Sequence, residues 1–426
     1  MKSKNTKHIR CFTKRKTTHY KLCNKIYFAK NIILSQLSIL FPTFALKHPT
    51  YMKIVLAIDS FKGCLSSEEA EIAAAEGIKT VFPHCNTVCI PIADGGEGML
   101  NVVIKTTKGH YHSIDAHNPL MEVIKTEYGI CGDEQTAVIE MAAISGLPLI
   151  SKENQNPMLT TSYGTGELIK DALNKGFRKF IVGIGGSATN DAGMGMLQAL
   201  GFRFLDKEGK TVGFGGKEMR NVAAIDRTFA HPALKDSHFT VACDVRNPFC
   251  GTEGAAYVFA RQKGADDAMI EELDKGMRSL AKVIHRVTGK EISHIPGAGA
   301  AGGMGGGLLA FLNAELKPGA ELLLEASRFQ EQICGADWII TGEGKVDKQT
   351  LQGKVPYSIL KVAQEQNIPV IVIAGSIEDR QELNRAGFKG VFSIAPGPIT
   401  LDKAMEPEFA KENIKRLLEQ LYSVMR

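Results

Sequence analysis

The chain has 426 residues, which is enough for two domains that each bury a core of their own. Its nine cysteines show no paired Cys-x-x-Cys spacing, which argues against a disulfide framework and against a zinc site. The net charge of +5 comes from the first 51 residues, which hold eleven Lys and Arg and no Asp or Glu. From position 52 onward 40 basic side chains face 46 acidic ones. Because that part is mildly acidic, we expect no nucleic-acid partner.

Residues 1–51 differ in kind from the rest of the chain. They are rich in Lys, Asn, Ile, Tyr and Phe, and their apolar stretch at 32–41 is too short and interrupted to span a membrane. Neither a signal-peptide cleavage site nor an Arg-rich import pattern is clear. Because residues 52–58 begin like the first strand of a cytosolic α/β protein, we expect 1–51 to be a disordered, non-native extension. We also expect a cytoplasmic location and no membrane partner.

From Met52 onward, strand and helix patterns alternate. We predict strands at 53–58 and 87–92, and a helix at 70–82 that starts from the capping box formed by Ser66 and Glu69. Short β-like runs between residues 110 and 142 indicate an antiparallel piece. Later strands are predicted at 180–184, 239–245, 336–341, 368–374 and 390–394, and later helices at 163–174, 266–288 and 407–425. The alternation predicts an α/β fold.

The most informative stretch is residues 179–196. An apolar run at 180–184 predicts a buried strand, and a helical pattern begins at Met194. Glycines and small polar residues lie between them, so free backbone N–H groups would stand at a helix start, where phosphate binds well. Alternatively, the glycines allow positive φ and the hydroxyl residues cap a tight corner. The phosphate-binding residues would be Gly185, Gly186, Ser187, Thr189 and Asn190.

Charged and polar residues follow several predicted strands, at the edge where open α/β sheets bind ligands. Asp94 and Glu97 share one short loop, and two carboxylates so close together favour a cation such as Mg²⁺ near them, although they could also be solvated turn residues. The other such residues are Asp59, Ser60, Lys62, Asp244, Arg246, Glu343 and Lys345. A second glycine cluster, with seven glycines between 297 and 307, includes Gly299, Gly302 and Gly303.

A dinucleotide-binding loop is an alternative interpretation of the central stretch. Gly183, Gly185 and Ala188 fit G-x-G-x-x-A after a strand, and Asp206 lies about 20 residues further on. This would make the protein an NAD-dependent dehydrogenase of a small hydroxy acid. Asp191 argues against it, because a carboxylate next to the loop would repel the pyrophosphate.

Five motifs occur in a fixed order that resembles the bacterial class I glycerate kinase family. They are Asp59-Ser60-Phe61-Lys62-Gly63, residues 93–98 (Ala-Asp-Gly-Gly-Glu-Gly), residues 185–191 (Gly-Gly-Ser-Ala-Thr-Asn-Asp), residues 296–303 and residues 340–350. The resemblance covers essentially residues 52–426. It implies transfer of the ATP γ-phosphoryl group to D-glycerate, usually giving 2-phosphoglycerate. It also implies two α/β domains with the active site in the cleft between them.

We expect the first domain to comprise residues 52–115 and 290–426 around a flavodoxin- or Rossmann-like parallel sheet. The second domain, with a mixed sheet and the central glycine loop, would comprise residues 116–289. As partners we expect only the small-molecule substrates D-glycerate and ATP, with the protein a monomer or a homodimer.

The chemistry of phosphoryl transfer suggests a role for each candidate residue. It needs backbone donors around the phosphates, a cation, carboxylates for Mg²⁺ and a base for the attacking hydroxyl. We predict Asp191 as the base, with Lys62 and Asp244 as further catalytic residues, and Asp94 and Glu97 as Mg²⁺ ligands. ATP would be held by the two glycine loops and Lys345, and glycerate by Asp59, Ser60, Arg246 and Glu343.

Overall fold

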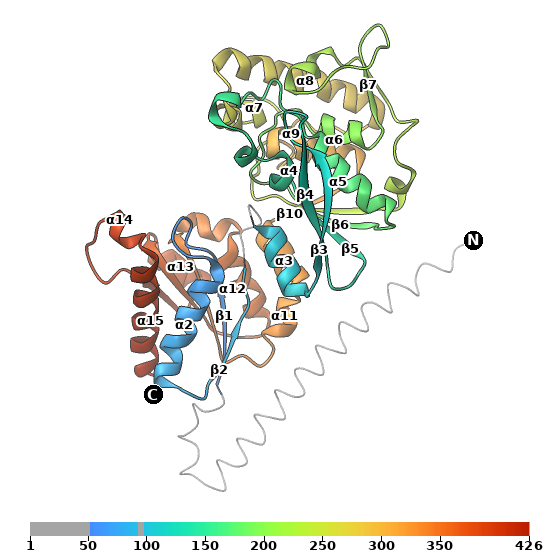
Figure 1. Cartoon of the computed structure of the whole chain (residues 1–426). Coiled ribbons are helices and arrows are strands. Elements are labelled where there is room, and N and C mark those ends of the chain that lie inside the picture. Colours follow the sequence, from blue (N-terminus) through green and yellow to red (C-terminus); the bar gives the residue numbers. More distant parts are fainter. Residues whose placement is uncertain (1–51, 93–97, 426) are drawn as a thin grey trace. The chain divides into compact units, whose positions relative to one another are not determined.

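The computed structural model describes residues 52–92 and 98–425, which form two compact units (Figure 1). Unit 1 comprises residues 52–90, Phe329–Lys348 and residues 359–425; unit 2 comprises Pro91–Arg328 and Gln349–Ser358. The expectations for residues 1–51, for Asp94 and for Glu97 lie outside the described residues.

The boundaries of the units differ from the predicted domain boundaries. Residues 91–115 and 290–328, which we expected in the first domain, belong to unit 2. Helix α3 (Met99–Thr107) packs on the sheet of unit 2 through Leu100 and Val103, and strand β10 (Glu315–Lys317) adds an edge to that sheet. The sequence pattern did not reveal either of these contacts.

Unit 1 is built on a five-stranded parallel sheet in the order β13-β12-β11-β1-β2. Relative to chain order this is 2-1-3-4-5, the flavodoxin-like arrangement that the sequence analysis expected. The strands are β1 (Lys53–Ile58), β2 (Asn86–Cys89), β11 (Trp338–Val346), β12 (Val370–Ile377) and β13 (Gly390–Ser393). The helices are α2 (Ser67–Val81), α11 (Phe329–Gln332), α13 (Arg380–Ala386), α14 (Leu401–Ala404) and α15 (Pro407–Ser423), while α12 (Val355–Glu365) crosses the boundary to unit 2 in sequence.

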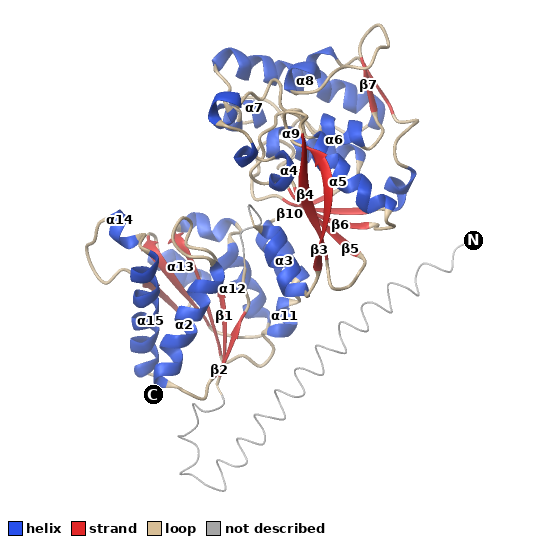
Figure 2. Cartoon of the chain, in the orientation of Figure 1, coloured by secondary structure: helices blue, strands red, loops and turns tan. Residues whose placement is uncertain are grey.

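Helices α2 and α15 lie side by side on one face of this sheet (Figure 1). The predicted capping box starts α2: the Ser66 hydroxyl accepts from the Glu69 N–H at 3.3 Å, and the Ser66 N–H donates to the Glu69 carboxylate at 3.0 Å. Gly77 allows the close approach, since a Cβ there would come within 2.3 Å of the Lys415 carbonyl oxygen. The layer of strands lies between helices, as Figure 2 shows.

Unit 2 contains a six-stranded mixed sheet in the order β10-β9-β6-β5-β4-β3. Strands β5, β6, β9 and β10 run parallel, and β3 and β4 form the antiparallel part that the sequence indicated. The strands are β3 (His110–His117), β4 (Val123–Ile130), β5 (Thr136–Glu140), β6 (Lys179–Gly183), β9 (His238–Ala242) and β10, with β7 (Arg203–Leu205) and β8 (Ala224–Asp226) as a separate antiparallel pair.

Two groups of helices cover the two faces of the unit 2 sheet. Helices α3 and α10 (Gly319–Ala326) pack on one face. The larger core on the other face collects the remaining helices, α4 (Ala142–Ser145), α5 (Tyr163–Asn174), α6 (Met194–Ala199), α7 (Ala255–Phe259), α8 (Asp267–Thr288) and α9 (Ala300–Phe311). Single 3-10 turns, such as η6 (Arg261–Lys263), connect several of them.

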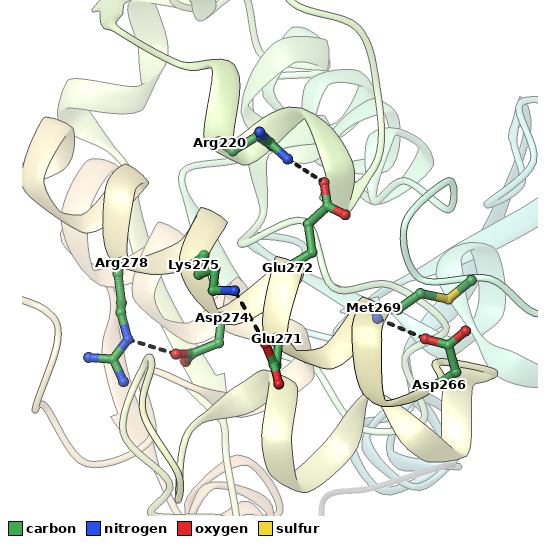
Figure 3. Close-up of polar contacts among 8 residues, drawn as sticks. All are labelled: Arg220, Asp266, Met269, Glu271, Glu272, Asp274, Lys275 and Arg278. Carbon is green, nitrogen blue, oxygen red and sulfur yellow. Dashed lines mark hydrogen bonds and ion pairs between the residues drawn. The ribbon is translucent and has the colours of Figure 1, made fainter.

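Polar contacts hold helix α8 at its start and along its length (Figure 3). The Asp266 carboxylate caps its start by accepting from the Met269 N–H at 2.8 Å, and Arg220 pairs with Glu272 at 2.8 Å. Asp274 is almost fully buried and accepts both from Arg278 at 2.6 Å and from the Gly251 N–H at 2.6 Å. The helix therefore holds the 247–251 segment in place beside the second glycine cluster.

Candidate active site

In unit 1 the predicted site residues gather where the strand order reverses. Strands β1 and β11 are neighbours there, with Ile58 opposite Gly342, and the chains leave them toward β2 and β12 on opposite sides. Open α/β sheets bind ligands at the carboxyl ends of the strands at such a switch point. Asp59, Ser60 and Lys62 follow β1 directly, and Glu343 lies in the adjacent part of β11.

Two carboxylates are largely buried at this edge. The exposed fraction is 5% for Asp59 and 9% for Glu343. The Asp59 carboxylate accepts from the Ser60 N–H at 2.7 Å, and the Asp59 N–H donates to the Gly342 carbonyl at 2.9 Å, which fixes the turn. Lys62 is exposed. The structure thus places Asp59, Ser60 and Glu343 at neighbouring positions of this sheet edge, where open α/β sheets bind ligands.

Lys345, predicted as a phosphate-binding cation, is engaged by acidic side chains. Its ammonium lies 2.9 Å from Glu378 and 3.7 Å from Asp347. The hydrogen bond to Glu378 raises the pKa of Lys345. Lys345 therefore lies between two carboxylates, and its predicted contact with phosphate stays a prediction.

In unit 2 the central glycine loop follows β6, as predicted. Gly186 is exposed and has a φ of +69°, a conformation that favours glycine. The loop is tied to the segment after β5, since the Ala188 N–H donates to the Ser145 carbonyl at 2.9 Å and the Leu147 N–H to the Gly186 carbonyl at 2.9 Å. Among the described residues, no acceptor takes the N–H groups of Gly185, Gly186 or Ser187. These three groups can bind an anion.

Asp191, the predicted base, lies inside the protein, and its catalytic role stays a prediction. Its carboxylate is fully buried and accepts five hydrogen bonds. The donors are the Ser162 N–H at 2.8 Å, the Ser162 hydroxyl at 2.9 Å, the Thr161 hydroxyl at 3.3 Å, and the N–H groups of Gly193 and Gly195 at 3.2 Å each. Burial raises the pKa of Asp191, while the Ser162 and glycine donors act in the opposite direction.

Asp191 also changes where phosphate can bind. The N–H groups of Gly193 and Gly195, at the start of the short helix α6, already donate to this carboxylate. Thr189 and Asn190, predicted to touch the phosphates, are fully buried as well. The start of helix α6 therefore holds the protein's own carboxylate, whereas the N–H groups of Gly185, Gly186 and Ser187 have no acceptor among the described residues.

A buried lysine that the sequence analysis missed supports this loop from inside. The Lys263 side chain is only 2% exposed, and its ammonium donates to the Ser187 hydroxyl and to the Thr189 carbonyl, both at 2.7 Å. Burial lowers the pKa of Lys263 to about 7, and the negative charge of Asp191 opposes that shift.

The second glycine cluster packs against the first instead of presenting a free loop. Residues 304–311 continue as helix α9 after three left-handed residues at 301–303. A Cβ at Gly302 would lie 2.1 Å from the Thr189 carbonyl oxygen, and one at Gly299 would lie 2.1 Å from the Pro248 carbonyl oxygen. At Gly303 it would lie 2.6 Å from the Met277 methyl group. Close packing accounts for these glycines, and their predicted contact with ATP stays a prediction.

Asp244 and Arg246 lie at the same edge of the sheet as the glycine loop. Gly183 of β6 pairs with Ala242 of β9, and two residues further along each chain come Gly185 and Asp244. Asp244 is exposed and accepts from the Gly319 N–H of α10 at 2.8 Å. Arg246 is also exposed, and no carboxylate of the described residues forms an ion pair with it.

Within the described ranges, no group of three or more His, Cys, Asp or Glu side chains could hold a metal ion. The predicted Mg²⁺ ligands Asp94 and Glu97 lie outside those ranges. No helix of the described residues is long and apolar enough to cross a membrane.

Comparison with known proteins decides the family. The model of the glycerate kinase family matches residues 54–426. The chain belongs to the glycerate kinase family.

Individual relatives agree with this assignment. The glycerate kinase of Halalkalibacterium halodurans is 46% identical over 354 residues, covering 83% of this chain and 93% of the relative. The glycerate 2-kinase of Escherichia coli is 45% identical over 366 residues, covering 86% and 96%. A crystal structure from Salmonella typhimurium, provisionally assigned as glycerate kinase 2, superposes with a TM-score of 0.78 at 41% identity, covering 88% of this chain and 98% of that one.

The dinucleotide alternative has no support in this glycerate kinase family member. In a dinucleotide fold, the acidic residue ends the next parallel strand of the same sheet. Here Asp206 follows β7, which pairs with β8 in a separate two-stranded antiparallel sheet. Its carboxylate accepts the N–H groups of Glu208 and Lys210 in the adjoining turn.

The sequence analysis missed most of the residues that surround the central loop. Thr160, Thr161 and Ser162 form a hydroxyl-rich run directly before α5, a pattern typical of a helix start that could have been noticed. Lys263 stands between Gln262 and Gly264, a context typical of a surface turn. No local signal marks it as buried.

Proposed function

We propose that this protein transfers the γ-phosphoryl group of ATP to D-glycerate and that the product is 2-phosphoglycerate. The family assignment and the near full-length match to a glycerate 2-kinase support the reaction and the position. The observation in the structure that carries the proposal is the loop after β6, with its three N–H groups available to an anion. We also propose a cytoplasmic location, because ATP is available to the enzyme there.

The phosphates of ATP are assigned to the N–H groups of Gly185, Gly186 and Ser187. Backbone donors hold oxyanions without needing to reorganise, which is what phosphoryl transfer requires. Lys62, at the switch point of unit 1, is the catalytic cation, because it is exposed beside the buried carboxylates of that edge. Lys345 is left a secondary role because of its ion pair with Glu378.

Arg246 is assigned to the glycerate carboxylate, since its planar guanidinium matches a carboxylate and it has no carboxylate partner of its own among the described residues. Asp59, Ser60 and Glu343 are assigned to the hydroxyl groups of glycerate. The Asp59 carboxylate, which is held by the Ser60 N–H, can accept such a hydroxyl hydrogen in a fixed direction.

Asp244 takes over the role of base that the sequence analysis gave to Asp191. It is the exposed carboxylate on the strand next to the glycine loop, and its bond from the Gly319 N–H orients the group. An exposed carboxylate can reach a substrate hydroxyl, whereas the Asp191 carboxylate is enclosed by five donors.

Mg²⁺ would enter with ATP and would neutralise charge on the phosphates. Carboxylate pairs suit it, because it usually takes one or two carboxylates together with phosphate oxygens. We assign Asp94 and Glu97 to this role.

A coupled assay for ADP, with D-glycerate and ATP as substrates and the product resolved by NMR, tests the proposal. Phosphate on the 2-hydroxyl supports it, phosphate on the 3-hydroxyl overturns the assigned position, and ADP formation that does not depend on glycerate overturns the substrate. Arg246→Met should raise the KM for D-glycerate at least tenfold. The matched control Arg220→Met, at an exposed arginine paired with Glu272 (Figure 3), should leave that KM unchanged.

A further inference from the structure

Lys263 is a buried lysine whose side chain donates to two groups of the central loop. It comes from η6, and Gly264 fixes its direction: the φ of Gly264 is +95°, and a Cβ there would lie 2.0 Å from the Gln155 carbonyl oxygen. The chain therefore turns sharply at Gly264, immediately after Lys263. The Lys263 side chain points inward and reaches Ser187, which is 76 residues away in sequence.

A buried ammonium is expensive, and an apolar residue of the same length would fill the same space without that cost. Packing alone therefore does not account for a lysine here. Its contacts indicate what the charge does. One bond fixes the Thr189 carbonyl, and the other fixes the side chain of Ser187, the last residue of the anion-binding loop.

The bond to Ser187 sets the direction of that hydroxyl. While it is protonated, Lys263 can only donate, so the Ser187 oxygen must then accept. Its own hydrogen is then left to donate, and no described residue accepts it. The hydroxyl donor consequently adds to the three N–H donors of Gly185, Gly186 and Ser187 in the same loop.

We propose that Lys263 is a positioning residue for phosphoryl transfer, which acts through Ser187 by holding its hydroxyl as a hydrogen-bond donor to the phosphates of ATP. This inference rests on the proposed function, because it takes the anion at the loop to be ATP. Lys263 itself does not touch the nucleotide, since it lies beneath the loop with almost no exposed surface.

A double-mutant cycle tests whether Lys263 works through Ser187. The variants are Lys263→Met, Ser187→Ala and the double variant, with Lys275→Met as the control, because Lys275 is an exposed lysine of α8 paired with Glu271 (Figure 3). The readouts are the Kd for ATP with Mg²⁺ by calorimetry and the KM values for ATP and for D-glycerate. Lys263→Gln, which keeps an N–H donor without the charge, serves if the methionine variant does not fold.

We expect Lys263→Met to weaken ATP binding at least tenfold, with the KM for D-glycerate within twofold of wild type. The double variant should bind ATP within about twofold of Ser187→Ala alone, because the lysine has no further route to the phosphates. A purely structural lysine would reduce the active fraction and thus the apparent kcat, but the KM for ATP would not change. That result, or effects of the two substitutions that multiply, would overturn the inference.

The same measurements distinguish a wrong proposed function from a wrong role of Lys263. A wild-type protein that does not bind ATP overturns both the function and this inference. A wild-type protein that binds ATP and phosphorylates glycerate, while Lys263→Met binds ATP within twofold of it, overturns only the role of Lys263.

Discussion

Replacing Asp191 by Asn distinguishes a positioning carboxylate from a catalytic base. The substitution keeps the shape of the side chain but removes the charge and turns one oxygen into an NH₂ group. In the structure, four of the five donors converge on one carboxylate oxygen, and the Gly193 N–H approaches the other. An asparagine can satisfy only one of these two sets.

The better orientation of the asparagine keeps its oxygen toward the four donors. Its NH₂ then faces the Gly193 N–H, which loses its acceptor in a fully buried place. An unsatisfied buried donor costs about 1–3 kcal/mol, and the loss of charge assistance in the remaining bonds adds roughly 1 kcal/mol. The buried Lys263 also loses its nearby negative charge. We therefore expect the free energy of unfolding to fall by about 2–4 kcal/mol.

Differential scanning calorimetry and steady-state kinetics measure both sides of this prediction. For a domain of this size each kcal/mol lowers Tm by about 2–4 °C, so Tm should fall by roughly 5–15 °C. Well below the new Tm, kcat should fall less than about tenfold, because no proton transfer is removed. The acidic limb of the pH–rate profile should remain where it is in the wild type.

The opposite pattern would refute this reasoning. If Tm stays within about 1 °C while kcat falls by more than about 10²-fold, Asp191 takes the substrate proton, as the sequence alone suggested. The loop would then have to open during the reaction and expose the carboxylate. The role of base assigned to Asp244 would be withdrawn.

Three further measurements probe the packing, the buried charge and the metal. Gly302→Ala should lower the free energy of unfolding by at least about 3 kcal/mol, because its Cβ would clash with the Thr189 carbonyl oxygen. The control Gly289→Ala, at a φ of +73° in open space, should lower it by only about 1 kcal/mol. Equal losses of the two variants in urea unfolding would contradict this. The pKa of Lys263 falls on folding, from its ordinary 10.5 to about 7. Above about pH 7 the unfolded chain therefore holds a proton that the folded chain lacks. The contribution of Lys263 to the free energy of unfolding consequently rises with pH above about 7, and it is lost as the pH falls through about 7. The Tm of the wild type minus that of Lys263→Met should therefore grow between about pH 7 and about pH 9, and a constant difference would speak against the buried lysine. Asp94→Asn should raise the Mg²⁺ concentration for half-maximal activity about tenfold, whereas an unchanged Mg²⁺ titration would remove Asp94 from the metal site.

The main strands were predictable from the sequence because each is an apolar run that ends in glycine or charged residues. β1, β6 and β11 begin within about two residues of their predicted positions, and α15 begins at the predicted Pro407. Helix α3 was not predicted, since its residues Val102, Val103 and Ile104 are β-branched and favour strands. Tertiary contacts override that preference: the Glu140 carboxylate accepts from the N–H groups of Gly98 at 2.7 Å and of Leu100 at 2.9 Å.

The glycine cluster at 297–307 shows a second limit of local patterns. Each glycine in a helix costs about 1 kcal/mol relative to alanine, so the sequence favours a loop there. In the structure, Gly305, Gly306 and Gly307 are helical because backbone or aromatic atoms lie against them. A Cβ at Gly306 would come within 2.5 Å of the Phe249 ring, and Phe249 is 57 residues away in sequence. Only the tertiary fold supplies that reason.

Several helices of unit 2 begin next to a carboxylate, and these carboxylates affect where an anion can bind. Three carboxylates each accept N–H groups from the start of a helix: Glu140 at α3, Asp191 at α6 and Asp244 at α10. Each neutralises a partial positive charge that would otherwise attract phosphate. The N–H groups of Gly185, Gly186 and Ser187 have no such partner among the described residues. We therefore expect an anion to bind at this loop and not at the three helix starts, because carboxylates of the protein already occupy those. An acidic residue near a glycine loop does not by itself argue against phosphate binding there.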